Sequence, residues 1–135
     1  MSETDTNARH YPAAVINITN RCTLRCKHCF VYRDGNPNDP RREMDTSTLV
    51  GKVSELKERH GIETMLWMGG EPMLRPDVLR RGTKLFAKNI VTTNGTLDLV
   101  DLSRCIYVIS VDGPPELNDT IRGKGSFDKV MKTLL

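Results

Sequence analysis

The sequence predicts an α/β fold built on a parallel sheet, with about four βα units. Short apolar runs recur along the 135 residues without strict alternation, which is typical of strands that are covered on both faces. A helical segment follows each run, and a βα unit needs about 30 residues or more, so four units occupy the whole chain. A closed barrel of eight units needs about 250 residues and is excluded.

Four apolar, partly β-branched runs are expected to form the strands, at residues 13–18, 64–68, 89–93 and 105–111. The longest helix is expected over residues 45–60. Asp45 or Thr46 can cap its start, and Gly61 follows it as a stop signal. Its apolar residues at helical spacing are expected to face the core, and they are Leu49, Val53 and Leu56.

Three further helices are expected. The second runs from Pro76 to about residue 87, because proline suits the first helical position and Asp77 suits the first turn. A short third helix is expected over residues 98–103. The last helix is expected to begin with Ser126 as its cap and to bury an apolar stripe, formed by Phe127, Val130, Met131, Leu134 and Leu135.

The composition limits the class of protein. No run of about 18 apolar residues is present, so no membrane span is expected. The net charge of +3 is too small to predict nucleic-acid binding. Residues 1–11 are polar and lack the apolar centre of a secretion signal, so a cytoplasmic protein is expected. We expect a polar tail over residues 1–12 and one domain over residues 13–135.

Unusual sequences follow all four expected strands. In parallel α/β folds, the chemistry gathers on the loops at the carboxyl ends of the strands. We therefore expect these four loops to form a single site. They are Cys22-Thr-Leu-Arg-Cys26-Lys-His-Cys29, Gly69-Gly-Glu-Pro72, Thr93-Asn-Gly95 and Ser110-Val-Asp-Gly-Pro114.

The first of these loops carries three of the four cysteines. Thiolates bind soft metals, chiefly zinc, copper(I) and iron–sulfur clusters. Structural zinc needs four ligands, and the candidate fourth ligand, His28, is adjacent to Cys29, which hinders binding to the same ion. A cubane cluster held by Cys22, Cys26 and Cys29 would leave one iron open to a substrate or cofactor. Cys105 is expected at the opposite end of the sheet. An iron–sulfur cluster, a zinc site and buried thiols without metal all remain open from spacing alone.

The cysteine spacing resembles the signature of the radical S-adenosylmethionine (radical SAM) enzymes, Cys-x3-Cys-x-aromatic-Cys, with His28 in the aromatic place. Gly69-Gly-Glu-Pro72 resembles the second motif of that family. Segments that begin at Ser110, Asn118 and Gly125 resemble one branch of it, the sulfatase-maturase-like and peptide-modifying enzymes, many of which carry a SPASM or related cluster domain. The resemblance covers about residues 13–135 and implies a partial (β/α) barrel of the radical SAM type.

This resemblance implies two cofactors, a 4Fe-4S cluster and S-adenosylmethionine. Cys22, Cys26 and Cys29 would ligate three of the irons. In the family, one electron from the cluster cleaves S-adenosylmethionine to methionine and a 5′-deoxyadenosyl radical, and the radical abstracts hydrogen from a substrate. The cofactors carry this chemistry, while the protein binds, orients and shields them. The branch implies a peptide or protein side chain as the substrate.

The resemblance also implies contacts to S-adenosylmethionine near the cysteines and the second strand. His28 would lie against the adenine. Backbone groups from Gly69 and Gly70 to Glu71 would receive the methionyl ammonium. Glycine suits this place because no Cβ blocks a close approach of the backbone. The side chain of Glu71 would orient the loop or meet the ammonium itself.

Further contacts are implied near the third and fourth strands. Ser110 would contact the ribose or the methionyl carboxylate, and Arg122 would pair with that carboxylate in the bidentate geometry that suits guanidinium. Asn94 and Asp112 are also candidates. Asn-Gly and Asp-Gly-Pro are equally ordinary turn sequences, so a purely structural role stays open for these two residues.

The family core usually holds about six βα units, whereas this chain supplies four. The implied partners are an electron donor such as flavodoxin or ferredoxin, a peptide or small-molecule substrate, and a missing C-terminal half or partner chain. Two other functions compete with radical chemistry. One is a structural zinc or other metal-binding module, and the other is an inactive, truncated relative that serves as a scaffold.

Overall fold

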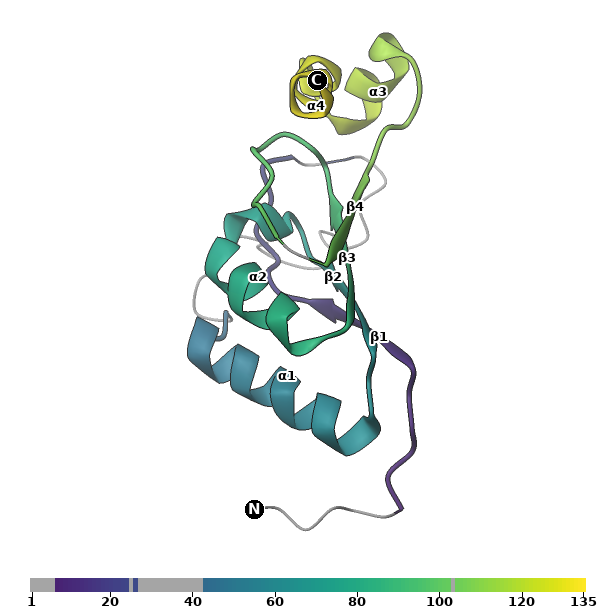
Figure 1. Ribbon diagram of the computed structural model, residues 1–135. Coiled ribbons are helices and arrows are strands. Elements are labelled where there is room, and N and C mark those ends of the chain that lie inside the picture. Colours follow the sequence, from purple (N-terminus) through teal and green to yellow (C-terminus); the bar gives the residue numbers. More distant parts are fainter. Residues whose placement is uncertain (1–6, 25, 27–42, 103) are drawn as a thin grey trace.

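The computed structural model describes residues 7–24, 26, 43–102 and 104–135. Strands and helices alternate through the first part of the chain, as predicted (Figure 1). The elements are β1 (Ala13–Asn17), α1 (Thr46–His60), β2 (Thr64–Met68), the 3-10 helix η2 (Pro72–Leu74), α2 (Pro76–Gly82), the 3-10 helix η3 (Thr83–Leu85), β3 (Lys88–Thr93), β4 (Cys105–Ile109), α3 (Pro115–Arg122) and α4 (Ser126–Leu134).

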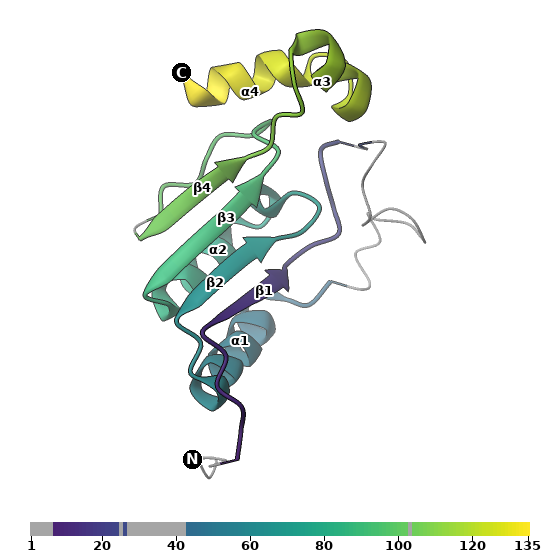
Figure 2. The same cartoon turned by 90° about the vertical axis from the view of Figure 1, so that its right-hand side faces the viewer.

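The four strands form one parallel sheet, in which their spatial order β1-β2-β3-β4 is also their order along the chain (Figure 2). In one row across the sheet, Val15 pairs with Leu66, Leu66 with Ile90, and Ile90 with Ile106. Since all strands run the same way, their four carboxyl ends lie along one edge of the sheet. The predicted parallel sheet and its four strands are confirmed.

Helix α1 begins and ends where its capping residues predict. The Asp45 carboxylate accepts a hydrogen bond from a first-turn N–H at 2.9 Å, and Gly61 ends the helix with a left-handed φ of 63°. Val53 is buried, but Leu56 is 47% exposed, so the prediction that Leu56 faces the core is wrong. The next side chain on the covered face after Val53 is instead the partly buried Lys57, which lies one i+4 step along the helix.

The second helix is shorter than predicted, because α2 gives way to η3 after Gly82. Gly82 packs directly under Trp67, and a Cβ at this position would lie 2.3 Å from the indole ring. The chain then turns into β3, where the side-chain amide of Asn89 donates to the carbonyl oxygens of Thr83 and Phe86 at 2.9 and 3.3 Å. The amide of Asn89 thus takes up carbonyl groups in the stretch where the sequence predicts one more turn of α-helix.

The core lies between the sheet and the two helices that cover one of its faces, α1 and α2 (Figure 1). Trp67 is 1% exposed and its indole N–H donates to the side-chain oxygen of Asn89 at 2.9 Å, so it is a core residue. Its neighbours in the core include Val53, Met65, Val78, Leu79, Phe86 and Val91.

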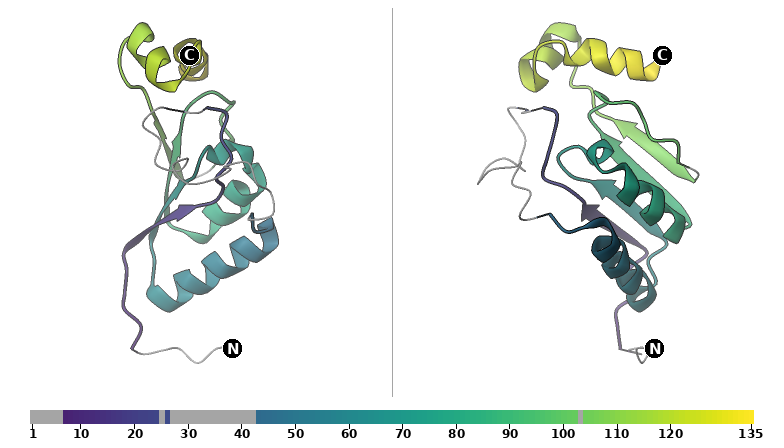
Figure 3. Two further views of the ribbon diagram at one scale, coloured as in Figure 1. Left: turned by 180° about the vertical axis from the view of Figure 1, so that it is seen from behind. Right: turned by 90° about the vertical axis from the view of Figure 1, so that its left-hand side faces the viewer.

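Within the described residues, no helix covers the other face of the sheet (Figure 3). Val15, Ile106 and Val108 are 60%, 65% and 46% exposed on the outer strands. The expectation that both faces are covered is therefore wrong for this part of the chain. Helices on one side only are the arrangement of a (β/α) barrel, in which the strands turn their other face towards the interior. The described residues thus form part of such a barrel.

After β4, the helices α3 and α4 lie beyond the carboxyl edge of the sheet (Figure 2). Helix α3 was not expected from the sequence, although Pro115 begins it and Gly123 follows it. The predicted cap of α4 is wrong, because Gly125 occupies the cap position. The carboxylate of Asp119 accepts hydrogen bonds from the N–H groups of Gly125 and Phe127, both at 2.9 Å, and so holds α3 and α4 together.

Two further expectations concern residues 98–103, before β4, and the apolar stripe of α4. No helix forms over residues 98–102, and Ser103 lies outside the described residues. At the end of the chain, Val130 is buried, whereas Leu134 and Leu135 are 52% and 99% exposed, so only part of the predicted apolar stripe is covered. None of the helices described here is both long enough and apolar enough to cross a membrane.

Candidate functional site

The loops after the four strands meet at the carboxyl edge of the sheet, as predicted. The segment after β1 runs beside the Gly-Gly turn after β2: the N–H of Gly70 donates to the Thr19 carbonyl at 2.7 Å, and that of Glu71 to the Arg21 carbonyl at 2.8 Å. On the other side, the Ser110 N–H donates to the Thr93 carbonyl at 3.0 Å, which joins the loops after β3 and β4.

The two glycines of this turn are required by a close approach of the main chain. A Cβ at Gly69 would lie 2.4 Å from the Thr19 carbonyl oxygen, and one at Gly70 would lie 2.2 Å from that of Arg21. Glycine is required at both positions because the segment that leads to the cysteines packs directly against them. The turn therefore fixes the path of the chain just before Cys22.

The side chain of Glu71 is completely buried and points back into the fold. Its two oxygens accept hydrogen bonds from the N–H groups of Met73 at 2.9 Å and Asn94 at 2.8 Å, and from the hydroxyl of Thr93 at 2.8 Å. Burial raises the pKa of Glu71 above its ordinary value, although these donors act in the opposite direction. Of the two roles expected for Glu71, this geometry is the one that orients the loop.

Asn94 joins the loop after β3 to the cysteine segment. Its side-chain N–H group lies 3.4 Å from Cys22 Sγ and 3.0 Å from Thr23 Oγ1. The same sulfur accepts a hydrogen bond from the backbone N–H of Leu24 at 3.4 Å. Asn94 is 6% exposed, so this contact is largely shielded from water. The structure thus brings Asn94 to a cysteine sulfur.

Arg122, at the end of α3, reaches the second described cysteine. Its Nε is paired with the carboxylate of Asp112, and its Nη1 lies 3.8 Å from Cys26 Sγ. The side chains of Arg122 and Asp112 are only 12% and 25% exposed. Two of the predicted site residues are therefore partners of each other.

Polar contacts join the chain just before the cysteines to the chain just before α1. They close the cysteine loop, and the sequence gives no motif for the residues that make them. Arg75 is 9% exposed, and its guanidinium donates to the carbonyl oxygens of Ile18 at 2.9 Å and Met44 at 2.7 Å. Nearby, Glu43 accepts the hydroxyl hydrogen bond of Thr19 and forms an ion pair with Arg21 at 3.1 Å. These contacts tie the chain before the cysteines to the chain entering α1. A lone arginine before a proline carries no sequence signal for such a role.

Cys29 and His28 lie outside the described residues, so the described part of the site contains two of the three predicted metal ligands. Within that part, no three potential metal ligands come together. The donor set nevertheless fits an iron–sulfur cluster, because the sulfurs of Cys22 and Cys26 receive N–H donors at the edge where the four loops meet. Cys105 begins β4 at the other end of the sheet, as predicted.

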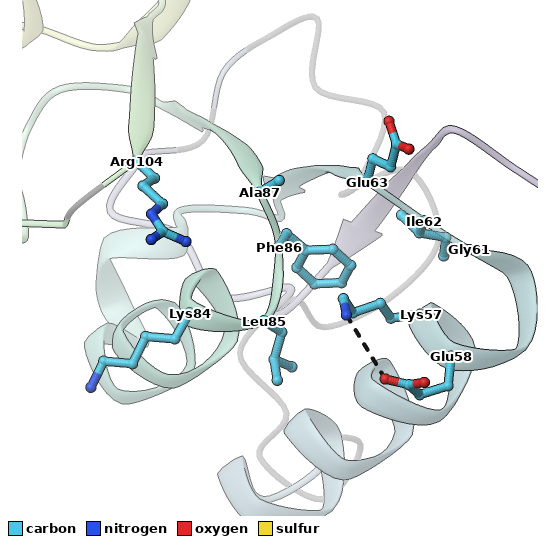
Figure 4. Close-up of a pocket in the computed structure, with 10 residues that line it drawn as sticks. All are labelled: Lys57, Glu58, Gly61, Ile62, Glu63, Lys84, Leu85, Phe86, Ala87 and Arg104. Atoms are coloured by element: carbon cyan, nitrogen blue, oxygen red, sulfur yellow. Dashed lines mark ion pairs between the residues drawn. The ribbon is translucent and has the colours of Figure 1, made fainter.

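A cavity of about 440 Å³ lies at that other end, around the starts of β2, β3 and β4 (Figure 4). Lys57 and Glu58 form an ion pair at 3.8 Å on its wall. The length of a strand, about 17 Å, separates this end of the sheet from the loops described above. The cavity is therefore not part of the candidate site. It is lined by Lys57, Glu58, Gly61, Ile62, Glu63, Lys84, Leu85, Phe86, Ala87 and Arg104.

Comparison with known proteins agrees with the geometry of the site. The profile of the radical SAM superfamily matches residues 16–135. The chain is 33% identical to Fe-coproporphyrin III synthase of Methanosarcina barkeri, over 91% of this chain and 33% of that protein. It is 30% identical to molybdenum cofactor biosynthesis protein 1 of Bos taurus, over 96% of this chain and 22% of that protein. It is also 32% identical to pre-heme d1 synthase of Dinoroseobacter shibae, over 89% and 32% of the two chains.

The chain thus spans a third or less of the length of these curated relatives. Their names do not point specifically to the sulfatase-maturase-like or SPASM branch, so the comparisons support the family and not that branch. Members of the family are enzymes that use a 4Fe-4S cluster and S-adenosylmethionine with an electron donor and a substrate. From the match over residues 16–135, the cysteine segment and the four-stranded parallel sheet, the chain belongs to the radical SAM superfamily.

Proposed function

We propose that this chain holds a 4Fe-4S cluster and S-adenosylmethionine at the carboxyl edge of its sheet and is the N-terminal part of a radical SAM enzyme. One observation carries the proposal. The sulfurs of Cys22 and Cys26 lie where the loops after β1, β3 and β4 meet, and the Gly-Gly turn after β2 is hydrogen bonded to the same segment. Cys29 is the third proposed ligand. When bound, the two cofactors supply a 5′-deoxyadenosyl radical.

The residues of this chain bind and orient these groups. An ammonium is a donor and needs acceptors, whereas the N–H groups of Gly70 and Glu71 already donate to the cysteine segment. The methionyl ammonium is therefore assigned to the carbonyl oxygens of Gly69 and Gly70. Ser110, at the end of β4, is assigned to the ribose or the methionyl carboxylate, and His28 to the adenine.

Two other candidate residues, Asp112 and Arg122, lie near the sulfur of Cys26. Asp112 is paired with Arg122, so its proposed part is to hold that guanidinium rather than to meet the cofactor directly. Flavodoxin or ferredoxin is the proposed electron donor. A further C-terminal segment or partner chain is proposed to complete the barrel, since β4 is an edge strand of the described sheet and the relatives are much longer than this chain.

For the substrate, we propose a small organic molecule. The support is that the relatives reported above are named for a coproporphyrin, a molybdenum cofactor and a pre-heme. A peptide or protein side chain is the second candidate, which the resemblance of the segments from Ser110 onward to peptide-modifying enzymes favours. The two substrate classes can be told apart by the cleavage of S-adenosylmethionine. Addition of the right class is expected to raise the yield of 5′-deoxyadenosine.

The cofactor proposal is tested by anaerobic reconstitution of the wild type, Cys26→Ala and Cys105→Ala. Cys105 is the matched control, because it is also a partly buried thiol but begins β4 at the other end of the sheet. We expect a brown wild type and a brown Cys105→Ala protein with iron and sulfide in equal amounts, and a Cys26→Ala protein without a stable cluster. A colourless wild type with one zinc per chain would show the structural metal module instead.

The activity proposal is tested with the reconstituted wild type, dithionite and S-adenosylmethionine, by measuring 5′-deoxyadenosine by mass spectrometry. Added coproporphyrin, GTP and short peptides then compare the substrate classes. We expect the small molecules to raise the yield. Stimulation by peptides alone would favour the second candidate. A protein that holds its cluster but releases no 5′-deoxyadenosine, even with a full-length relative's C-terminal part supplied, would be an inactive scaffold.

A further inference from the structure

We propose that Asn94 and Arg122 are positioning residues that donate hydrogen bonds to the ligand sulfurs of Cys22 and Cys26 and thereby raise the reduction potential of the cluster. This inference rests on the proposed function and adds to it. The donors come from two separate elements, the loop after β3 and the end of α3, and each reaches a different sulfur.

The orientation of the Asn94 amide is fixed by its own partners. Its Oδ1 accepts hydrogen bonds from the backbone N–H of Thr96 at 3.0 Å and from the Thr96 hydroxyl at 2.7 Å. A backbone N–H can only donate, so the atom facing it must be the oxygen. The Nδ2 group must then face Cys22 Sγ and Thr23 Oγ1, at 3.4 and 3.0 Å. The amide presents a donor, not an acceptor, to the sulfur.

The orientation of Arg122 is fixed by Asp112. The carboxylate takes the Nε–H edge of the guanidinium, which leaves Nη1 directed at Cys26 Sγ, at 3.8 Å. Asp112 is itself held, because its backbone N–H donates at 2.9 Å to the side chain of Asn118, a completely buried residue. Asn118 in turn donates to Ser126 Oγ at 3.0 Å. The guanidinium is therefore connected to the start of α4 through a chain of polar contacts, of which the one between Asn118 and Ser126 is buried and the others are partly buried.

The chemistry of the sulfurs gives these donors their effect. Reduction of the cluster by one electron from an external donor, dithionite in the test below, adds negative charge that is shared by the ligand sulfurs, and no bond is formed or broken. Hydrogen bonds to those sulfurs stabilise the reduced form and make the reduction potential less negative. Arg122 adds a positive charge to its hydrogen bond, although Asp112 offsets much of that charge.

This role differs from pairing of Arg122 with the methionyl carboxylate. A partner of the carboxylate would change the affinity for S-adenosylmethionine and leave the potential of the cofactor-free cluster unchanged. A donor to the sulfur would change that potential before any S-adenosylmethionine is added. The two roles can therefore be separated by one measurement with and one without S-adenosylmethionine.

The test compares the reconstituted full chain with Asn94→Ala, Arg122→Gln, Arg122→Lys and the control Arg21→Gln. Arg21 lies in the same segment as Cys22, and its guanidinium pairs with Glu43, so Arg21→Gln removes an equal charge without removing either of the sulfur contacts made by Asn94 and Arg122. The midpoint potential is measured by electron paramagnetic resonance during a dithionite titration without S-adenosylmethionine. Binding of S-adenosylmethionine is then measured separately on each protein.

We expect Asn94→Ala and Arg122→Gln to shift the midpoint to more negative values than Arg21→Gln does, and Arg122→Lys to recover part of the shift. If Asn94→Ala fails to hold a cluster, the Arg122 pair decides the outcome. Equal midpoints for Arg122→Gln and Arg21→Gln would overturn the inference. Lost affinity for S-adenosylmethionine at an unchanged midpoint would assign Arg122 to the carboxylate instead. A wild type without iron would overturn the inference and the proposed function together.

Discussion

The hydroxyl group of Thr93 donates its hydrogen bond to the carboxylate of Glu71, at 2.8 Å from both oxygens, and so joins the end of β3 to the turn after β2. With the N–H groups of Met73 and Asn94, it surrounds the carboxylate with donors. The side chain at position 71 must therefore be an acceptor at both of its terminal atoms.

Glu71→Gln tests this arrangement. Glutamine has nearly the same shape, but its amide group would point N–H donors at the N–H of Met73 or Asn94. We expect the free energy of unfolding to fall by about 1–3 kcal/mol, the cost of a buried donor without an acceptor. Urea unfolding measures it, and Glu55→Gln, on the exposed side of α1, is the control. Equal stability of the Glu71→Gln protein and the wild type would contradict the assignment.

Gly70→Ala tests the contact between the turn and the cysteine segment. A Cβ at this position would lie 2.2 Å from a backbone oxygen, which cannot move like the end of a flexible side chain. We expect a loss of about 1–3 kcal/mol of stability, typical of overpacking. Gly51→Ala is the matched control, because nothing lies within 4 Å of its Cβ position in α1. That substitution should instead stabilise the helix by about 0.5–1 kcal/mol.

Arg75→Met tests the closure of the cysteine loop. Methionine keeps much of the length of the side chain but donates no hydrogen bond to the carbonyl oxygens of Ile18 and Met44. We expect a loss of about 1.5–3 kcal/mol, the range for hydrogen bonds from a charged group. The control is Arg80→Met, because Arg80 is 56% exposed and pairs with Asp77 only at the surface, which is worth about 0–1 kcal/mol. Similar losses in the two variants would argue against a special role for Arg75.

Asp119 predicts a pH dependence of stability. The backbone N–H groups of Phe127 and Gly125 hold the pKa of Asp119 below its ordinary value of 3.8. Its contribution is therefore fully present above pH 3.8 and is lost as the pH falls through the lower pKa of the folded state. Unfolding at a series of pH values should show a smaller acid-induced loss for Asp119→Asn than for the wild type. The same pH dependence in both proteins would rule out this contribution.

The sequence predicts those elements whose signals are local. The Asp45 cap and the Gly61 stop define α1, and the apolar run at residues 64–68 defines β2. By contrast, α3 has few apolar residues, and its one buried side chain, that of Asn118, makes its contacts with Asp112 and Ser126. Such polar contacts leave no periodic pattern in the sequence, so this helix was missed.

The same distinction holds for the candidate site. The motifs predict which loops meet, because the carboxyl ends of parallel strands share an edge. They do not predict which side chains in those loops bind one another. The pairing of Asp112 with Arg122, and the contact of Asn94 with Cys22, depend on how α3 and the loop after β3 pack in three dimensions. The role of Arg75 depends on two carbonyl groups, which every residue possesses, so no residue type marks it in advance.

The two residues that donate to the cysteine sulfurs, Asn94 and Arg122, are synthesised long after the cysteines themselves. Asn94 follows Cys22 by 72 residues, and Arg122 follows Cys26 by 96. An iron–sulfur group delivered to the nascent chain as soon as the cysteines emerge would meet thiols without these polar neighbours. The hydrogen bonds to both sulfurs can form only once α3 has been synthesised and has docked, so the proposed adjustment of the cluster's potential depends on the later part of this chain and not on the cysteine segment alone.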